Sequence, residues 1–334
     1  MNDAAHYLLY NLAKALSPFM QQDSYLYWPY IVSSIAIALF AWGWLGAAGT
    51  ARKPWRDFWR QYFSPEIWWH RSAQADYWLY FANALVVPAA FAFVLIDDRH
   101  FAGLLGSTFG LSEAPAAANL TGITTRVLFT LAFFFAYDFG RFAMHCLLHD
   151  VPVLWEFHKI HHSAEVLTPV TTFRAHPVEL LLMAWGPVIT TGLVTVAFNA
   201  IVPGTISVYT FLGWHVAFFA FNLVDNLRHS PVWLSYGPMW GRWLVSPAHH
   251  QLHHSCEPRH FGCNRGFELA IWDRLYGTLY VPANQPEQFR LGLGDGSEAR
   301  YHHLGRMYAL PFVTAGREMT NVLRRTFGRF FFAK

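Results

Sequence analysis

The sequence predicts an all-α, polytopic membrane protein with about five spanning helices and a His-rich helical cap that faces the cytoplasm. Composition is the first observation behind this prediction, because hydrophobic residues make up 54% of the 334 residues, aromatic residues 18% and charged residues 13%. That charged fraction is about half of what soluble globular domains carry. The second observation is a series of long uncharged stretches, and the third is the clustering of the 18 histidines.

The uncharged stretches are long enough to cross a bilayer as helices, which takes about 20 residues. They are apolar all round, whereas the core helices of a soluble protein show a polar face at helical period. The third stretch carries Arg126 near one end, where its long side chain can reach the interface. The 45 uncharged residues of 180–224 exceed one crossing, and a turn at 199–204 divides them. The predicted spans are 24–51, 77–96, 119–137 and the two arms of the hairpin 180–224.

The distribution of basic residues predicts the orientation of these spans. Loop 52–75 carries five Lys or Arg residues, whereas loop 97–118 carries one. Basic loops stay in the cytoplasm, which places 138–178 and everything after Asp225 on the cytoplasmic side and the amino terminus outside. Only Lys14 precedes the first apolar stretch, without a small-residue cleavage pattern, so we expect no removed signal peptide.

Three regions follow from this topology. Residues 1–137 form the membrane-anchoring spans one to three, 138–282 form a His-rich catalytic region that includes the two-span hairpin, and 283–334 form a basic cytoplasmic tail. The end of the tail, 317–334, mixes arginines with phenylalanines, which fits either a helix on the membrane surface or a solvated basic tail. The net charge of +3 excludes a nucleic-acid-coating protein, and the sequence does not indicate an oligomeric state.

The histidines gather in two short windows. An average 18-residue window of this chain holds about one His, yet 145–162 and 249–260 each hold five. Their spacings of three and four residues place imidazoles on one face of a helix, so each triplet His158, His161, His162 and His250, His253, His254 is expected to form a three-pronged face. Isolated histidines are interpreted as ordinary structural residues; these are His6, His70, His100, His215, His302 and His303.

The clustered imidazoles predict a metal site, because neutral imidazole is the commonest protein ligand for transition metals. With His145 and His149 the two triplets offer eight rings, more than one ion uses, so we favour two metals. The three cysteines Cys146, Cys256 and Cys263 form no Cys-x-x-Cys pair and indicate neither a disulfide framework nor a thiolate zinc site.

The chemistry that we favour for these metals is the activation of oxygen by iron. A zinc hydrolase or isomerase would need a carboxylate base, which these motifs lack, and a metal transporter would place its ligands at the bilayer midplane.

The motifs resemble the fatty acid hydroxylase or sterol desaturase superfamily of integral membrane di-iron oxygenases. The resemblance covers about residues 60–282 and includes segment 172–179, Thr-Phe-Arg-Ala-His-Pro-Val-Glu. It implies nine iron ligands, adding His229 to the eight clustered residues: His145, His149, His158, His161, His162, His229, His250, His253 and His254. Residues that could support these ligands without binding metal are Asp138, His176, Asp225, His249 and His260.

The sequence allows more than one role for two of these supporting residues. Asp225 stands where some relatives have a second His, and it could bind metal, orient a ligand or cap a helix. His176 could support the centre or cap the helix that begins beside Pro177. Tyr137, Trp155 and Trp272 are interpreted as interface anchors rather than as the lining of a substrate tunnel.

The resemblance also implies a reaction. Two iron ions (Fe2+/Fe3+), with zinc as a substitute, would use molecular oxygen and two external electrons to hydroxylate a C–H bond of a lipid drawn from the bilayer. Desaturation of a sterol or lipid at the same site is the alternative outcome. No flavin, haem or iron-sulfur motif is visible, so the electrons are expected from a separate donor protein, docking near residues 52–60.

Overall fold

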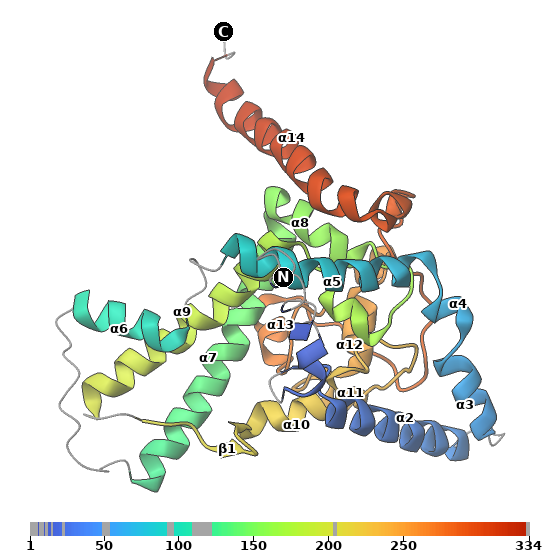
Figure 1. Cartoon of the computed structure of the whole chain (residues 1–334), viewed down its shortest axis with the longest axis horizontal. Coiled ribbons are helices and arrows are strands. Elements are labelled where there is room, and N and C mark those ends of the chain that lie inside the picture. The colour runs from blue at the N-terminus through green and yellow to red at the C-terminus, as the bar shows by residue number, and fades with distance from the viewer. Residues whose placement is uncertain are drawn as a thin grey trace.

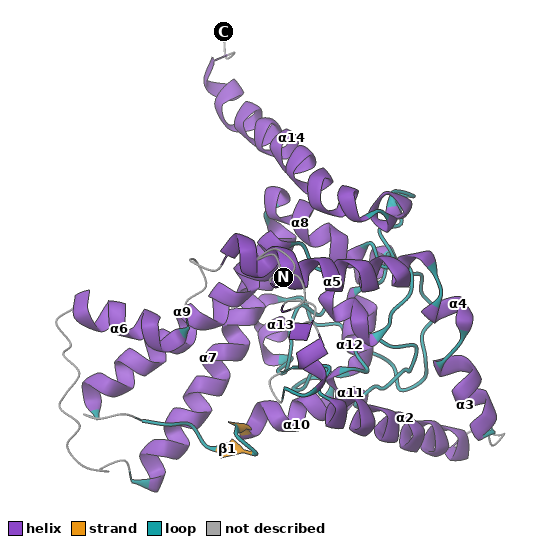
Figure 2. Ribbon diagram, in the orientation of Figure 1, coloured by secondary structure: helices purple, strands orange, loops and turns teal. Residues whose placement is uncertain are grey.

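The computed structural model describes residues 6, 10, 13–14, 16–21, 24–48, 54–91, 97–108, 122–202 and 206–331, with the side chains of 44–48, 98 and 326–331 left out. The described chain is mostly helical (Figures 1 and 2). The α-helices are α2 Trp28–Ala48, α3 Trp55–Tyr62, α4 Pro65–Trp68, α5 Arg71–Phe91, α6 Asp98–Thr108, α7 Ile123–Asp150, α8 Pro152–His162, α9 Pro177–Ile201, α10 Val216–Asp225, α11 Gly237–Trp240, α12 Pro247–His253, α13 Ile271–Tyr276 and α14 Leu304–Phe331. Short 3-10 helices are η1 Ser17–Phe19, η2 Pro169–Phe173, η3 Pro258–His260 and η4 Glu298–His302, and the strands are β1 Thr210–Phe211 and β2 Trp214–His215.

Two helices, α7 and α9, are long and apolar enough to cross a membrane. They lie side by side (Figure 1), and glycines let them approach closely. A Cβ added to Gly140 of α7 would lie 2.6 Å from the carbonyl oxygen of Gly186 in α9, and a Cβ on Gly186 would lie 2.4 Å from the carbonyl oxygen of Gly140. Thr190 also donates a hydrogen bond to the carbonyl of Ala136 across the pair. Close packing through small residues is the usual way in which membrane helices associate.

The hairpin 180–224 differs from its prediction in the second arm. The first arm is α9, but the second arm is helical only in the ten residues of α10. Residues 206–215 instead form loop and the antiparallel pair β1–β2, with Leu212 and Gly213 in the left-handed region at φ of 49° and 84°. An apolar run predicts burial in lipid or protein but does not require helix, provided that the backbone groups find partners.

Those partners come from α7. The Arg126 side chain donates to the carbonyls of Ser207 and Val208 at 3.1 Å each. The Thr130 hydroxyl accepts from the backbone N–H of Tyr209 at 2.9 Å. The His215 ring bonds the Thr130 carbonyl and caps α10, which confirms the structural interpretation of this histidine.

Most described residues of the other predicted spans are helical. The first corresponds to α2, of which 28–43 form an apolar segment, and the second corresponds to α5, whose last predicted residues, 92–96, lie outside the described chain. Helix α5 carries Asp76, which forms a fully buried ion pair with Arg174. Neither α2 nor α5 reaches the length and hydropathy of α7 and α9 over its described residues, so the count of five remains a prediction.

The segment after α7 packs against the rest of the chain through three clusters of core residues. Ile160 of α8 packs with Leu79 of α5 and Met307 of α14. Leu227, after α10, packs with Phe58 of α3, while Leu252 of α12 packs with Trp233. The chain thus surrounds α8 and α12, which carry most of the clustered histidines, with elements from the whole length of the protein.

Candidate metal centre

The nine histidines predicted as ligands lie together; they come from α7, α8, α12 with its C-terminal cap, and the segment that follows α10. They form two groups, within each of which the potential ligand atoms lie within 4.8 Å of one another. Eight of the nine side chains are buried and His149 is half-buried. Group A contains His145, His149, His158, His162 and His253, and group B contains His161, His229, His250 and His254.

The structure divides each predicted triplet between the groups. His158 and His162 belong to group A while His161 belongs to group B, and His250 and His254 belong to group B while His253 belongs to group A. The expectation of one three-pronged face per triplet was therefore wrong. Residues i and i+4 nearly align on a helix of 3.6 residues per turn, but i+3 and i+4 point about 100° apart. Each triplet consequently contributes to both groups and links them, and the rings of His162 and His254 lie 4.8 Å apart between centroids.

Three of the five Nδ1 atoms of group A face a hydrogen-bond partner. The Nδ1 of His145 is 2.7 Å from the carbonyl oxygen of Arg265, and that of His253 is 2.7 Å from the carbonyl oxygen of Cys263. The Nδ1 of His158 is 2.7 Å from a carboxylate oxygen of Glu179. Because a backbone carbonyl only accepts, the Nδ1 atoms of His145 and His253 must carry the proton, and each of these neutral rings keeps an unprotonated Nε2. The same holds for His158 opposite the ionised form of Glu179.

These Nε2 atoms converge. The Nε2 of His145 lies 3.0 Å from that of His158 and 3.1 Å from that of His253. Three acceptor lone pairs at this distance repel one another unless a cation lies between them. Imidazole nitrogens on a transition metal, with bonds of about 2.0 to 2.1 Å, lie about 2.9 to 3.4 Å apart, so the observed spacing fits a metal ion.

Group B has the same spacing with fewer Nδ1 partners. The Nε2 of His229 is 2.9 Å from that of His250 and 3.1 Å from that of His254. The Nδ1 of His161 faces the carbonyl of Arg174, and that of His229 faces the hydroxyl of Thr172. The Nδ1 atoms of His250 and His254 have no hydrogen-bond partner among the described residues. The residues present thus fit two adjacent transition-metal sites.

Burial keeps these rings neutral at physiological pH. Removal from water, together with the positive charge of Arg265, lowers the pKa of His253 to about 4. Removal from water, followed by the charge of the neighbouring His253, lowers the pKa of His161 to about 3. The pKa of His162, His250 and His254 is lowered well below the usual value for the same reasons. Neutral imidazole is the form that binds metal.

The predicted supporting residues all lie outside the two groups. Asp138 accepts hydrogen bonds from the backbone N–H groups of Glu268 and Leu269 and from Trp272 Nε1, so it holds the 268–272 segment against α7. Asp225 pairs at 3.0 Å with Arg228, the residue before His229. Their contribution to the centre is therefore to the backbone that positions it.

The three remaining supporting histidines have structural partners. His176 accepts a hydrogen bond from the N–H of Val178 and caps α9. Capping this helix was one of the two roles that the sequence allowed for His176. The His249 ring caps α12 at Ser246, and the His260 ring bonds the Ser255 hydroxyl. Sequence spacing placed His249 and His260 in the same window as the ligands, but it does not show which neighbour a ring reaches.

Several functional contacts were not predicted. The sequence analysis included Glu179 in a family motif without giving it a role, and it gave none to Thr172. The backbone carbonyls that bind His145, His161 and His253 have no sequence signal. Trp155 packs against His149 and His162, with ring centroids 5.2 and 5.3 Å apart, so this aromatic residue borders group A.

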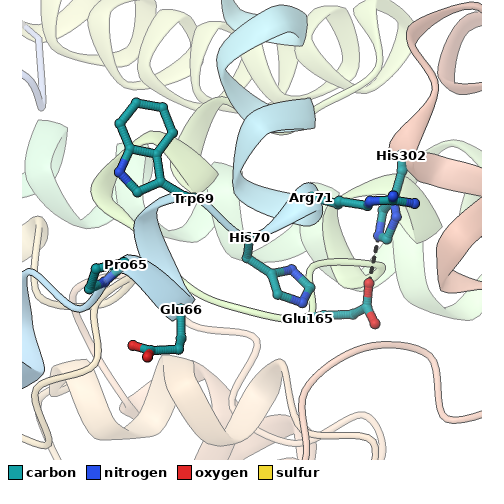
Figure 3. A pocket seen from close by; sticks show the side chains of 7 residues that line it. All are labelled: Pro65, Glu66, Trp69, His70, Arg71, Glu165 and His302. Carbon is teal, nitrogen blue, oxygen red and sulfur yellow. Dashed lines mark hydrogen bonds and ion pairs between the residues drawn. The ribbon is translucent and has the colours of Figure 1, made fainter.

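The isolated histidines lie away from both groups. His70 and His302 line an open pocket of about 460 Å³ together with Trp69, Arg71 and Glu165 (Figure 3). The His302 ring points at the Glu165 carboxylate, 2.5 Å away (Figure 3). His6, His100 and His303 are exposed.

Comparison with known proteins shows which family the histidine-rich region resembles. Residues 130–278 match the fatty acid hydroxylase family model, and this stretch contains all nine histidines of groups A and B. This part of the chain is therefore similar to the fatty acid hydroxylase superfamily. No solved structure matches the chain.

Named relatives agree with this assignment. The chain is 29% identical over 156 residues to the alkylglycerol monooxygenase of Xenopus tropicalis, covering 46% of this chain and 30% of the relative. It is 28% identical over 181 residues to the ornithine lipid hydroxylase OlsE of Rhizobium tropici, covering 54% and 49%. It is 31% identical over 186 residues to the cholesterol 25-hydroxylase of Rattus norvegicus, covering 55% of each. The chain spans about half or less of the length of these curated relatives.

Proposed function

We propose that this protein is a membrane-bound di-iron oxygenase that hydroxylates a C–H bond of a lipid. The observation that carries the proposal is the pair of adjacent imidazole groups A and B, whose unprotonated Nε2 atoms converge at metal-ligand spacing inside the fatty acid hydroxylase region. Two groups of four and five nitrogens favour two ions over one. The three His motifs contain no carboxylate that could act as the general base of a zinc hydrolase, which favours oxygen activation.

Two iron ions in these groups would supply the activation of molecular oxygen. The balanced reaction combines one lipid C–H bond, one O2, two electrons and two protons to give the lipid alcohol and one water. Zinc can occupy the same imidazole sites without supplying this redox chemistry.

The chain contributes orientation and the exclusion of water. The carbonyls of Arg265 and Cys263 and the carboxylate of Glu179 fix the ring orientation of three group A ligands. A hydrogen bond from a ligand's other nitrogen to such a partner also raises the basicity of the ligating nitrogen. Burial of eight of the nine rings keeps bulk water from the centre, and the half-buried His149 marks its more open side.

A lipid substrate is favoured by the position of the centre and by the relatives. His145 and His149 lie in the last turns of α7, a candidate span, so a molecule in the bilayer lies within reach of the site. The relatives are named for an alkylglycerol, an ornithine lipid and cholesterol, which share a membrane-soluble body rather than a head group. All three are named monooxygenases or hydroxylases, which favours hydroxylation over desaturation.

The remaining parts of the proposal concern the side of the membrane on which the catalytic region lies and the source of the two electrons. We place the catalytic region at 138–282 on the cytoplasmic side of a multi-pass protein, following the basic loop 52–75. A separate protein would deliver the two electrons. Arg56 and Arg60 are exposed on α3 and remain candidates for its docking, whereas 52–53 lie outside the described residues.

The deciding experiment compares lipid extracts of cells that express the wild-type chain, His253→Ala or no chain. We expect a lipid 16 daltons heavier, the mass of one oxygen atom, with the wild type alone, and two irons per purified chain by elemental analysis. His303→Ala, an exposed residue outside both groups, is the matched control and should retain the product. A single metal per chain, or turnover with zinc and no oxygen, would contradict the proposal.

A further inference from the structure

Helix α14 consists of a packed half and a free half. In the packed half, Met307 and Ala315 are buried and the Tyr308 hydroxyl donates to Asn83 of α5 at 2.7 Å. The Phe312 ring contacts Phe157 of α8, with centroids 5.2 Å apart. Beyond Ala315 no side chain is buried in the described part of the helix, 316–325. The helix therefore leaves the body of the protein at Ala315 and projects from it, as Figure 1 shows.

The free half has an apolar and a basic face. Met319, Val322 and Leu323 are spaced by three and four residues and share one face, where their exposed fractions are 46, 38 and 47%. Arg317, Asn321 and Arg325 follow each other at intervals of four on the other side, with Arg324 beside them. Glu318 is the single acidic residue of 316–325, so the polar face carries an excess of positive charge.

A free helix with these faces requires a partner. Isolated helices of this length are marginal in water, and exposed apolar side chains add an unfavourable free energy of hydration. A lipid surface satisfies both faces, because the apolar side chains enter the acyl boundary while arginines bind anionic phosphate groups. A second copy of the helix would satisfy the apolar face but would bring arginines of like charge together.

The position of α14 supports the lipid surface. Helix α14 packs on α8, which begins two residues after α7 ends. In Figure 1 α14 runs across the direction of α7 and α9 rather than along it. A helix that packs on the element directly after a candidate spanning helix, and runs across the direction of that span, lies near the level of the membrane surface. We propose that residues 316–325 form an interfacial helix that binds an anionic lipid surface, in addition to the proposed catalytic function.

The test uses the full chain in lipid nanodiscs and does not depend on turnover. Spin labels are attached to Met319→Cys and Leu323→Cys on the apolar face and to Asn321→Cys on the polar face; the three native cysteines are buried. Collisions with oxygen, which enriches in lipid, are compared with collisions with a water-soluble nickel reagent. In nanodiscs containing anionic lipid, we expect the labels at 319 and 323 to favour oxygen and the label at 321 to favour nickel.

Charge reversal separates the anionic surface from other partners. Each reversal of Arg317, Arg324 or Arg325 to Glu should shift the helix away from the surface by about fivefold or more, since one arginine near an anionic membrane contributes about a factor of five. Arg306→Glu, an exposed arginine on the packed half, is the matched control and should leave the accessibilities unchanged. Equal exposure of both faces to nickel, shielding of 319 and 323 from both reagents as in a protein contact, or a pattern independent of anionic lipid would overturn the proposal.

Discussion

At the scale of single residues, the most informative contact is that between Glu179 and His158. Glu179 is buried and its Oε1 lies 2.7 Å from the Nδ1 of His158. In its ionised form, a carboxylate at this position holds the ring more firmly than a neutral carbonyl and makes its Nε2 more basic. Glu179 is therefore a positioning residue, acting through His158.

We expect Glu179→Gln to lower metal affinity or activity by about 10 to 100-fold, the usual effect of losing such a partner. The amide oxygen can still accept the Nδ1 proton, so Glu179→Ala should have a larger effect. The measurement is iron content against free iron concentration, together with turnover. Glu156→Gln is the control, because Glu156 lies on the same helix as His158 but pairs with Lys159. Equal effects of Glu179→Gln and Glu156→Gln would rule out the positioning role.

Depressed pKa values of the histidines predict a pH-dependent stability of the metal-free protein. His253, with a pKa of about 4, and His161, with a pKa of about 3, are neutral when folded, whereas an unfolded histidine titrates near 6.5. Between pH 6.5 and about 4 the unfolded chain binds protons that the folded chain does not. The free energy of unfolding should therefore fall as the pH falls through this window.

Thermal unfolding of metal-free protein in detergent at pH 7.5 and pH 5 measures this effect. His253→Asn and His161→Asn each remove one such group, so the melting temperature of each variant should change less between the two pH values than that of the wild type. A wild-type melting temperature that is the same at both pH values would contradict the prediction.

The sequence predicted the ligand candidates far better than it predicted their arrangement. Spacing and resemblance together identified nine histidines, and the structure gathers all nine. Spacing alone did not show that His161 belongs to group B while the other two histidines of its triplet belong to group A, or that His253 belongs to group A while its triplet neighbours belong to group B. That division depends on how α8 and α12 face each other. The backbone carbonyls of Arg265 and Cys263 face the histidines because of the local backbone conformation. The identity of a side chain does not predict where its backbone carbonyl points.

At the scale of elements, the crossing of α7 and α9 depends on Gly140 and Gly186. Gly140→Ala would place its Cβ 2.6 Å from a backbone oxygen, which cannot move without shifting α9. We expect a loss of about 1 to 3 kcal/mol of stability, as for other overpacked sites, measured by thermal unfolding in detergent. Gly316→Ala in α14 is the control, because its Cβ meets nothing within 4 Å, and it should be neutral or stabilising. Equal melting temperatures for wild type and Gly140→Ala would show that the two helices separate easily.

Hydropathy correctly predicted helices where the backbone hydrogen bonds stay within one helix, as in α7 and α9. It did not predict the conformation of 206–215, which is apolar but forms a loop and the β1–β2 pair instead of a helix. The partners of that segment, Arg126 and Thr130, lie about 80 positions earlier in the sequence. A local hydropathy window has no access to such contacts, so the number of complete spans could not be derived from it.

At the scale of the whole molecule, the centre requires both His windows on one side of the membrane. Group A joins His145 from the end of α7 to His253 of α12, with α9 and α10 between them in the chain. The chain must therefore return to the side on which it left, whichever side that is. The basic loop 52–75 predicts that this side is the cytoplasm.

Cysteine labelling in intact and permeabilised cells tests this topology. Pro152→Cys and Gln285→Cys stand at exposed positions near the two windows, and both should react with a membrane-impermeant maleimide only after permeabilisation. Ser112→Cys, in the predicted external loop 97–118 and outside the described residues, should react in intact cells. The unmodified chain gives the background, since its three cysteines are buried. Reaction of both Pro152→Cys and Gln285→Cys in intact cells would reverse the orientation but keep the shared centre, whereas opposite sides for these two positions cannot be reconciled with groups A and B in one folded chain.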